Sequence, residues 1–241
     1  MTSSRTHHQE KTLNCDKCGG MHDSIFCAMG KLDLGILAEN KTMLHFKKGQ
    51  VIFHQNTHPQ GLYCVHSGKV VIHSYNDNGR NQILRLAKCG SILGYRALFT
   101  NERYHVSATA IEDSTVCYFP QSAYQEHIIS NHSVAIEIIK LLSADLKTAE
   151  LKAMSMVHKQ VRERIAETLI VLRDFFGTEE NNVTLNTILS RENIADIAGA
   201  TTETTIRVLS DFQKAGIIEL AGKSIGILNV KELLRIANLP E

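Results

Sequence analysis

The sequence lacks a long apolar run, a strong net charge and a recognisable catalytic signature. No stretch approaches the roughly 18 consecutive apolar residues that cross a bilayer, so we expect no membrane association. The formal net charge of the 241 residues is only +1, and no bulk basic excess indicates nucleic acid. Neither a glycine-rich phosphate loop nor a nucleophile–base pair stands out, which argues against an enzyme.

The start of the chain, Met1–Asn14, is polar and has no apolar segment after its charges, so it does not predict a signal peptide. We therefore expect a cytoplasmic protein. In that reducing compartment, six cysteines favour metal binding, catalysis or burial over structural disulfides. Three of them crowd into one stretch, at Cys15, Cys18 and Cys27, and this arm (residues 1–30) is a candidate sensor.

Short apolar runs separated by turn residues fill residues 31–130 and are typical of antiparallel β-structure. The segment Asn76–Gly79 (NDNG) predicts a tight hairpin turn. Strands this short and regularly spaced predict a β-roll or jelly roll. The predicted strands are Val51–Phe53, Gly61–Val65, Lys69–His73, Gln82–Leu86, Ser107–Ala110 and Thr115–Phe119.

Residues 131–159 predict one long helix, because apolar residues there recur at helical spacing and neither Gly nor Pro interrupts them. The spacing alternates between three and four without a charged position, as in a coiled-coil seam, and predicts a constitutive homodimer. Burial of the helix within one subunit is the alternative. Ile138, Leu141 and Leu151 fall on another face and are expected to pack on the β-roll. The seam residues are Ile139, Leu142, Leu146, Ala149, Ala153 and Met156.

Residues 160–241 predict a winged helix-turn-helix. After an amphipathic helix at Gln160–Phe176, Ser190 can cap the first of two short helices, and Gly199 supplies the left-handed residue that ends it. Two short helices joined by such a turn are the signature of this motif. The predicted wing strands and closing helix are Ile217–Leu220, Ile225–Leu228 and Lys231–Ala237.

The second short helix, capped by Thr201 or Thr202, carries the residues expected to read DNA. Glu203 and Arg207 lie four residues apart on one face, where a carboxylate can accept from cytosine N4 and a guanidinium can bind guanine. A surface ion pair worth a few tenths of a kcal/mol is the alternative. Because acidic residues outnumber basic ones from Gln160 onward, phosphate contacts need a locally basic face. The candidate phosphate contacts are Arg191, Thr204 and Lys214.

A β-roll, a long dimerisation helix and a winged helix-turn-helix, in that order, resemble the CRP/FNR family of bacterial transcription regulators. The resemblance begins near Leu34 and is strongest over Arg191–Ile218, which is similar to the FNR branch. The family motif E-x-x-[SG]-R becomes Glu203, Ile206 and Arg207 here, so an apolar contact from Ile206 to a thymine methyl is expected. The resemblance implies an α+β fold with a cyclic-nucleotide-binding-like β-roll. It also implies a dimer that binds a palindromic promoter site in double-stranded DNA and contacts RNA polymerase.

The cyclic-AMP receptors of this family hold the ribose with a Glu after a Gly, and the phosphate with an Arg further on. In this sequence Tyr95 follows Gly94, and Tyr104 or His105 stands where the Arg is expected. Neither replacement provides a bidentate grip on phosphate. We therefore expect that the chain does not bind cyclic AMP and responds to another effector.

In the FNR branch, an N-terminal cysteine cluster and one β-roll cysteine hold a [4Fe–4S] cluster. The segment Ser114–Pro120 (STVCYFP) is similar to the strand with the β-roll ligand. The longer spacing C-x2-C-x8-C in the arm costs little closure entropy. Such a site would sense oxygen, nitric oxide or redox state. The ligands that the resemblance implies are Cys15, Cys18, Cys27 and Cys117.

Two other chemistries remain open for the arm. A Cys15/Cys18 pair could act as a dithiol switch. A closed Cys3His zinc site would instead leave the β-roll to bind a different small-molecule effector. Cys64 and Cys89 are interpreted as buried free thiols. The zinc ligands would be Cys15, Cys18, His22 and Cys27.

Overall fold

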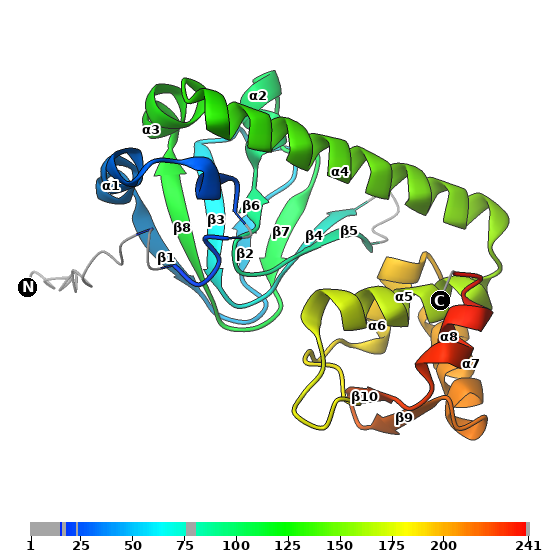
Figure 1. The fold of residues 1–241 in the computed structure, drawn as a ribbon. Helices are drawn as coiled ribbons and strands as arrows, with labels where there is room; N and C mark the ends of the chain where they lie inside the picture. The colour runs from blue at the N-terminus through cyan, green and yellow to red at the C-terminus, as the bar shows by residue number, and fades with distance from the viewer. Residues whose placement is uncertain (1–14, 16–17, 23, 76–80, 240–241) are drawn as a thin grey trace, which may run out of the picture. The chain divides into compact units, whose positions relative to one another are not determined.

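The computed structural model of the chain describes residues 15, 18–22, 24–75 and 81–239 (Figure 1). The polar start and the Asn76–Gly79 turn therefore lie outside the described residues. Contacts divide the chain into two compact units. The first runs up to Val70 and includes Ala87–Leu142, and the second combines Val71–Leu86 with the residues from Ser143 onward. Residues 71–86 thus group with the C-terminal part, whereas the sequence places them inside a β-roll at 31–130.

Two antiparallel sheets confirm the expected β-structure between residues 42 and 120. Strand β8 is central to the first sheet, since it pairs with both β1 and β3. The first sheet has the order β1 (Thr42–Phe46), β8 (Ser114–Pro120), β3 (Gly61–Ser67) and β6 (Ile92–Leu93). The second has the order β2 (Val51–Phe53), β7 (Ser107–Ala110), β4 (Val70–Tyr75) and β5 (Asn81–Ala87).

Several short elements of the first unit carry no clear signal in the sequence. They include strands β1 and β6 and five helical segments of nine residues or fewer. Tertiary packing stabilises them, as for α1, whose Leu34, Leu37 and Ala38 are buried. The helical segments are η2 (Ile25–Ala28), α1 (Lys31–Glu39), α2 (Tyr95–Thr100), α3 (Gln121–Ala123) and η3 (Tyr124–Ile129).

The register of β3 and β8 determines which side chains enter the core of the first unit. Leu62 lies opposite Phe119, and Cys64 lies opposite Cys117. Because side chains alternate along a strand, these four point to one face, where all are buried. They form one apolar cluster with η2, α1, η3 and the first turns of the following helix.

The predicted long helix is confirmed as α4 (His132–His158). Ile138 is buried and Leu141 packs on the apolar cluster, as expected. Leu151 is 56% exposed, so its expected packing on the β-roll is wrong. Neither α4 nor any other helix in the described ranges is long and apolar enough to cross a membrane.

The predicted seam on α4 is largely uncovered by its own chain. Leu146 at its centre is 61% exposed, and only Met156 at its end is half-buried. Helix burial inside one subunit would hide these apolar side chains, so the structure contradicts that alternative. A second copy of α4 would cover them. The exposed seam residues are Ile139, Leu142, Leu146, Ala149 and Ala153.

The second unit confirms the predicted winged helix-turn-helix. The capping box at Gln160 and Glu163 fixes the start of its first helix. Leu169, Ile194 and Phe212 are fully buried at its core. Its elements are α5 (Val161–Phe176), α6 (Arg191–Ala198), α7 (Thr202–Lys214), β9 (Ile218–Ala221), β10 (Ser224–Ile227) and α8 (Val230–Ile236).

We expect Leu146→Asp to convert the dimer to a monomer, because a charge buried in an apolar seam is costly without a partner. Size-exclusion chromatography with light scattering at micromolar concentration measures this. Leu151→Asp is the matched control, since Leu151 is similarly exposed but lies off the seam, and it should stay dimeric. A dimeric Leu146→Asp variant, or a monomeric metal-free wild type, would contradict the seam.

Candidate functional site

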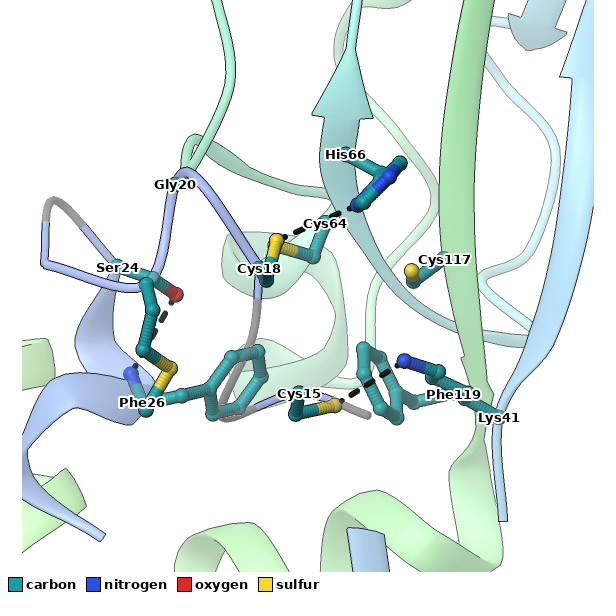
Figure 2. Close-up of a pocket in the computed structure, with 11 residues that line it drawn as sticks. Cys15, Cys18, Gly20, Ser24, Phe26, Lys41, Cys64, His66, Cys117 and Phe119 are labelled. Carbon is teal, nitrogen blue, oxygen red and sulfur yellow. Dashed lines mark hydrogen bonds between the residues drawn. The ribbon is translucent and has the colours of Figure 1, made fainter. Parts of the chain in front are cut away.

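Four cysteines from distant parts of the sequence line one pocket in the first unit (Figure 2). Cys15 and Cys18 belong to the N-terminal segment, Cys64 lies on β3 and Cys117 on β8. The cavity between them measures about 20 Å³, which is room for about one water molecule. The remaining lining residues are Gly20, Met21, Ser24, Phe26, Lys41, His66 and Phe119.

Basic side chains contact the thiols. The buried ammonium of Lys41 donates to Cys15 Sγ at 3.2 Å, and Cys18 Sγ lies 3.3 Å from His66 Nδ1, as the dashed lines in Figure 2 show. Cys89 lies beside them, with its Sγ donating to the backbone oxygen of His66 at 2.8 Å. A buried ammonium favours negative charge nearby, so the pocket is suited to thiolates.

Burial controls the protonation of these groups. It raises the pKa of the Cys64 thiol, and the neighbouring thiols of Cys117 and Cys18 raise it further. Burial also raises the pKa of Cys117 to about 11, against the opposing effect of the Lys41 ammonium. The pKa of His66 is lowered by burial and by Lys41. Without a metal, Cys64, Cys117 and His66 are therefore neutral at pH 7.

Cys27 lies outside the pocket. Helix η2 turns Ile25 and Phe26 into the core and leaves the Cys27 side chain exposed. The Phe26 ring packs on Phe119 with 5.3 Å between centroids, which holds η2 in this orientation. The structure thus brings together Cys15, Cys18 and Cys117 from the ligand set that the sequence predicts, but not Cys27.

The zinc site that the sequence leaves open is not assembled. His22 and Cys27 are both exposed, whereas Cys15 is buried. Across the residues that the structure describes, no three His, Cys, Asp or Glu side chains are grouped to hold a metal ion.

Sequence reasoning missed Cys64 as a pocket residue. The sequence predicts a buried thiol in a strand, and burial is what the structure shows. The only available signal was that LYCVHSG and STVCYFP each carry one cysteine in a short apolar strand. Their pairing depends on the β3–β8 register, which neither segment encodes locally.

Helices α6 and α7 form the expected DNA reader. Ser190 Oγ accepts from the Asn193 backbone N–H at 3.0 Å and caps α6. Gly199 ends α6 with a φ of 61°, a left-handed conformation that favours glycine. Thr201, rather than Thr202, caps α7, since its Oγ1 accepts from the Thr204 backbone N–H at 3.2 Å.

The exposed face of α7 carries all three residues predicted to contact bases. Glu203, Ile206 and Arg207 are exposed, with Ile206 at 51%, while Thr205, Leu209 and Phe212 on the opposite face are buried. Spacings of three and four place the first three side by side, as major-groove reading requires.

The three predicted phosphate contacts have different surroundings. Lys214 is exposed in the last turn of α7. Thr204 is half-buried in the first turn of α7, where its hydroxyl accepts from Thr201 Oγ1. The half-buried guanidinium of Arg191 donates to the backbone oxygen of Gly222 at 3.0 Å, in the turn between the wing strands. Arg191 therefore holds the wing against the start of α6.

The position of the family's nucleotide-phosphate ligand is occupied by an aromatic stack. Tyr104 is buried and stacks on Phe53 with ring centroids 4.1 Å apart. A Cβ added at Gly94 would lie only 3.2 Å from the Tyr104 ring, and Tyr95 is also buried. The neighbouring His105 is exposed. Buried rings offer no charge to a phosphate, and the expectation that the chain does not bind cyclic AMP stays a prediction.

Comparison with known proteins covers both units. Residues 43–131 match the model of the cyclic nucleotide-binding domain, and residues 163–236 match that of the Crp-like helix-turn-helix domain. The structure of FixK2 from Bradyrhizobium japonicum shares the fold, with a TM-score of 0.72 and 22% identity, over 83% of this chain and 99% of that one.

Three relatives extend the match along the chain. The fumarate and nitrate reduction regulatory protein of Vibrio cholerae is 29% identical over 80% of this chain and 77% of its own length. The anaerobic regulatory protein of Bacillus subtilis is 26% identical over 83% and 85%. The CRP-like cAMP-activated global transcriptional regulator of Mycobacterium tuberculosis is 27% identical over 88% and 96%.

A cyclic-nucleotide-binding-type β-domain, a long helix and a C-terminal helix-turn-helix define a DNA-binding transcription regulator and not an enzyme. The chain belongs to the CRP/FNR family of transcription regulators. Regulators of this family are dimers, which accounts for the apolar seam on α4.

In the reduced, metal-free protein we expect iodoacetamide to modify Cys27 at least about ten times faster than Cys64 or Cys117. Cys27 is exposed, whereas burial and a raised pKa keep the other two as protonated thiols. Peptide mass spectrometry after a short pulse at pH 7 measures the order. Labelling of Cys117 should accelerate as the pH rises toward its pKa of about 11. Equal labelling of all three would contradict the pocket.

Proposed function

We propose that this cytoplasmic regulator senses oxygen, nitric oxide or cellular redox state through a [4Fe–4S] cluster in the thiol pocket. The observation that carries the proposal is the convergence of Cys15 and Cys18 with Cys117 in one buried pocket. The names of two relatives, an anaerobic regulatory protein and a fumarate and nitrate reduction regulatory protein, support it.

The donor set of the pocket suits such a cluster. A [4Fe–4S] cluster takes four thiolates, and Cys15, Cys18 and Cys117 supply three of them. The Lys41 ammonium lies where it offsets their negative charge. The cavity holds about one water molecule without a metal, so a bound cluster would require the lining side chains to rearrange. When bound, the cluster would supply iron that reacts with diatomic gases and changes oxidation state.

The competing zinc site has less support. It requires His22 and Cys27, both of which are exposed, and it leaves Cys117 without a role. No observation favours it over the pocket that contains Cys117.

A physical path connects the pocket with the DNA reader. Cys15 and Cys117 belong to the same apolar cluster as Val134 and Ile138 of α4, so a change at the thiols repacks the start of that helix. At its other end, Met156 lies against Gly199 in the helix-turn-helix. Arg164 of α5 also donates to the carbonyl oxygen of Gly199. The signal would act by shifting the population of α4 arrangements.

The DNA target of the proposed dimer is a palindromic promoter site, because two symmetry-related α7 helices read two half-sites. Glu203, Ile206 and Arg207 would contact base edges there, and RNA polymerase would be the partner in activation or repression.

We expect anaerobically purified protein to contain about four irons and four sulfides per chain and to bleach in air. Cys117→Ala removes one thiolate and should lose the cluster, because no other described thiol occupies its position on β8. Absorption spectra with iron, sulfide and zinc analysis measure both. Colourless protein with one zinc per chain, unchanged by Cys117→Ala, would refute the proposed sensor and leave the DNA reader intact.

Arg207→Ala should relax specificity at one guanine position by about 1–3 kcal/mol, since a bidentate contact to guanine is worth that much. Binding to randomised duplexes, followed by titration of the selected site and its variants, measures the change. Arg235→Ala on α8 is the control, because that exposed arginine pairs with Glu232 on its own helix. An equal loss of affinity for all sequences would assign Arg207 to phosphate contact instead.

A further inference from the structure

Two of the four pocket thiols belong to the β-sheet, and their positions do not depend on the N-terminal segment. Cys64 and Cys117 are directly opposite each other on the antiparallel strands β3 and β8. Opposed residues have Cα atoms about 4.5–5.5 Å apart and side chains on the same face. Both residues line the pocket with Cys15 and Cys18, and Figure 2 shows the Cys15 sulfur directed to Lys41 and the Cys18 sulfur to His66. Two ligand positions therefore lie on one sheet of fixed geometry.

All four thiols line one pocket. Their proximity raises the pKa of Cys64 through Cys117, Cys18 and Cys15, and that of Cys117 through Cys15, Cys18 and also Cys89, which lies beside the pocket without lining it. Two thiols come from the sheet and two from the segment that covers it, so a group bound between them would join the two parts. The number of these thiols is the one that a four-thiolate centre takes, but among the described residues no three of them are grouped to hold a metal ion, so binding requires these side chains to rearrange.

Cys27 can enter the pocket only at the expense of the core. Helix η2 places Ile25 and Phe26 among buried residues and Cys27 on its outer side. Turning Cys27 inward would pull Phe26 away from Phe119 and break the cap in which Ser24 Oγ accepts from the Phe26 backbone N–H. Such a turn would uncover the buried Phe26 ring, which is unfavourable because apolar surface would return to water.

From this placement we propose that Cys64, and not Cys27, is the fourth thiolate of the cluster. This inference rests on the proposed function and assigns a ligand within it. The cluster is then held by two residues of the arm, Cys15 and Cys18, and by two paired residues of the β-sheet, Cys64 and Cys117. Cys27 is left outside as an accessible thiol.

The test compares Cys27→Ser with Cys64→Ser, both purified anaerobically as the full chain. Iron and sulfide per chain and the absorption and electron paramagnetic resonance spectra are measured. Cys27→Ser should retain the wild-type content of about four irons with unchanged spectra. Cys64→Ser should fall below half of that content. Cys89→Ser is the matched control, because Cys89 touches His66 beside the pocket but does not line it.

Loss of iron from Cys27→Ser, or full retention of iron with wild-type spectra in Cys64→Ser, would overturn the inference. Because Cys64 is buried, Cys64→Ala provides a second apolar variant, and circular dichroism with the dimer elution volume establishes that each variant is folded. Cys27 is exposed, so Cys27→Ser should fold normally. Loss of iron from this variant would by itself show that Cys64 does not replace Cys27 as a ligand. A wild-type protein without iron would instead refute the proposed function itself.

Discussion

The pairing of β8 with its two neighbours is the constraint on which the sensor end of this regulator depends. Its register with β3 sets Cys117 against Cys64 and Phe119 against Leu62, and its register with β1 sets Cys117 beside Met43. A shift of β8 by one residue would turn both Cys117 and Phe119 to the other face of the sheet. Both the pocket and the core that supports it would then disappear together.

The fold followed from sequence patterns wherever local signals are strong. The helix-turn-helix has a capping serine at Ser190 and a left-handed glycine at Gly199, and the structure places both as predicted. The long helix was predictable because its period continues without Gly or Pro over seven turns. Short elements such as α1 and β6 escaped prediction, since their conformation is set by neighbours that are distant in the sequence.

The candidate pocket was predictable only in part, for the same reason. Clustering of Cys15 and Cys18 in the sequence, and the resemblance at Cys117, identified three residues that the structure brings together. Cys64 and Lys41 required the strand register, which periodicity does not reveal. Cys27 is the opposite case. Its closeness in sequence predicted that it would lie with Cys15 and Cys18, but helix η2 turns its side chain outward.

Helix α4 also has a mechanical consequence. At 27 residues it is about 40 Å long and has no break. Its first turns belong to the same apolar cluster as the thiols, so repacking at the thiols acts on this end of the helix. Along a straight helix of this length, a tilt of about 5° at one end corresponds to a displacement of about 3.5 Å at the other, close to the rise of one base pair, about 3.4 Å. A small angular change at the thiol end of α4 therefore becomes, at the far end of the same helix, a displacement on the scale of one base pair.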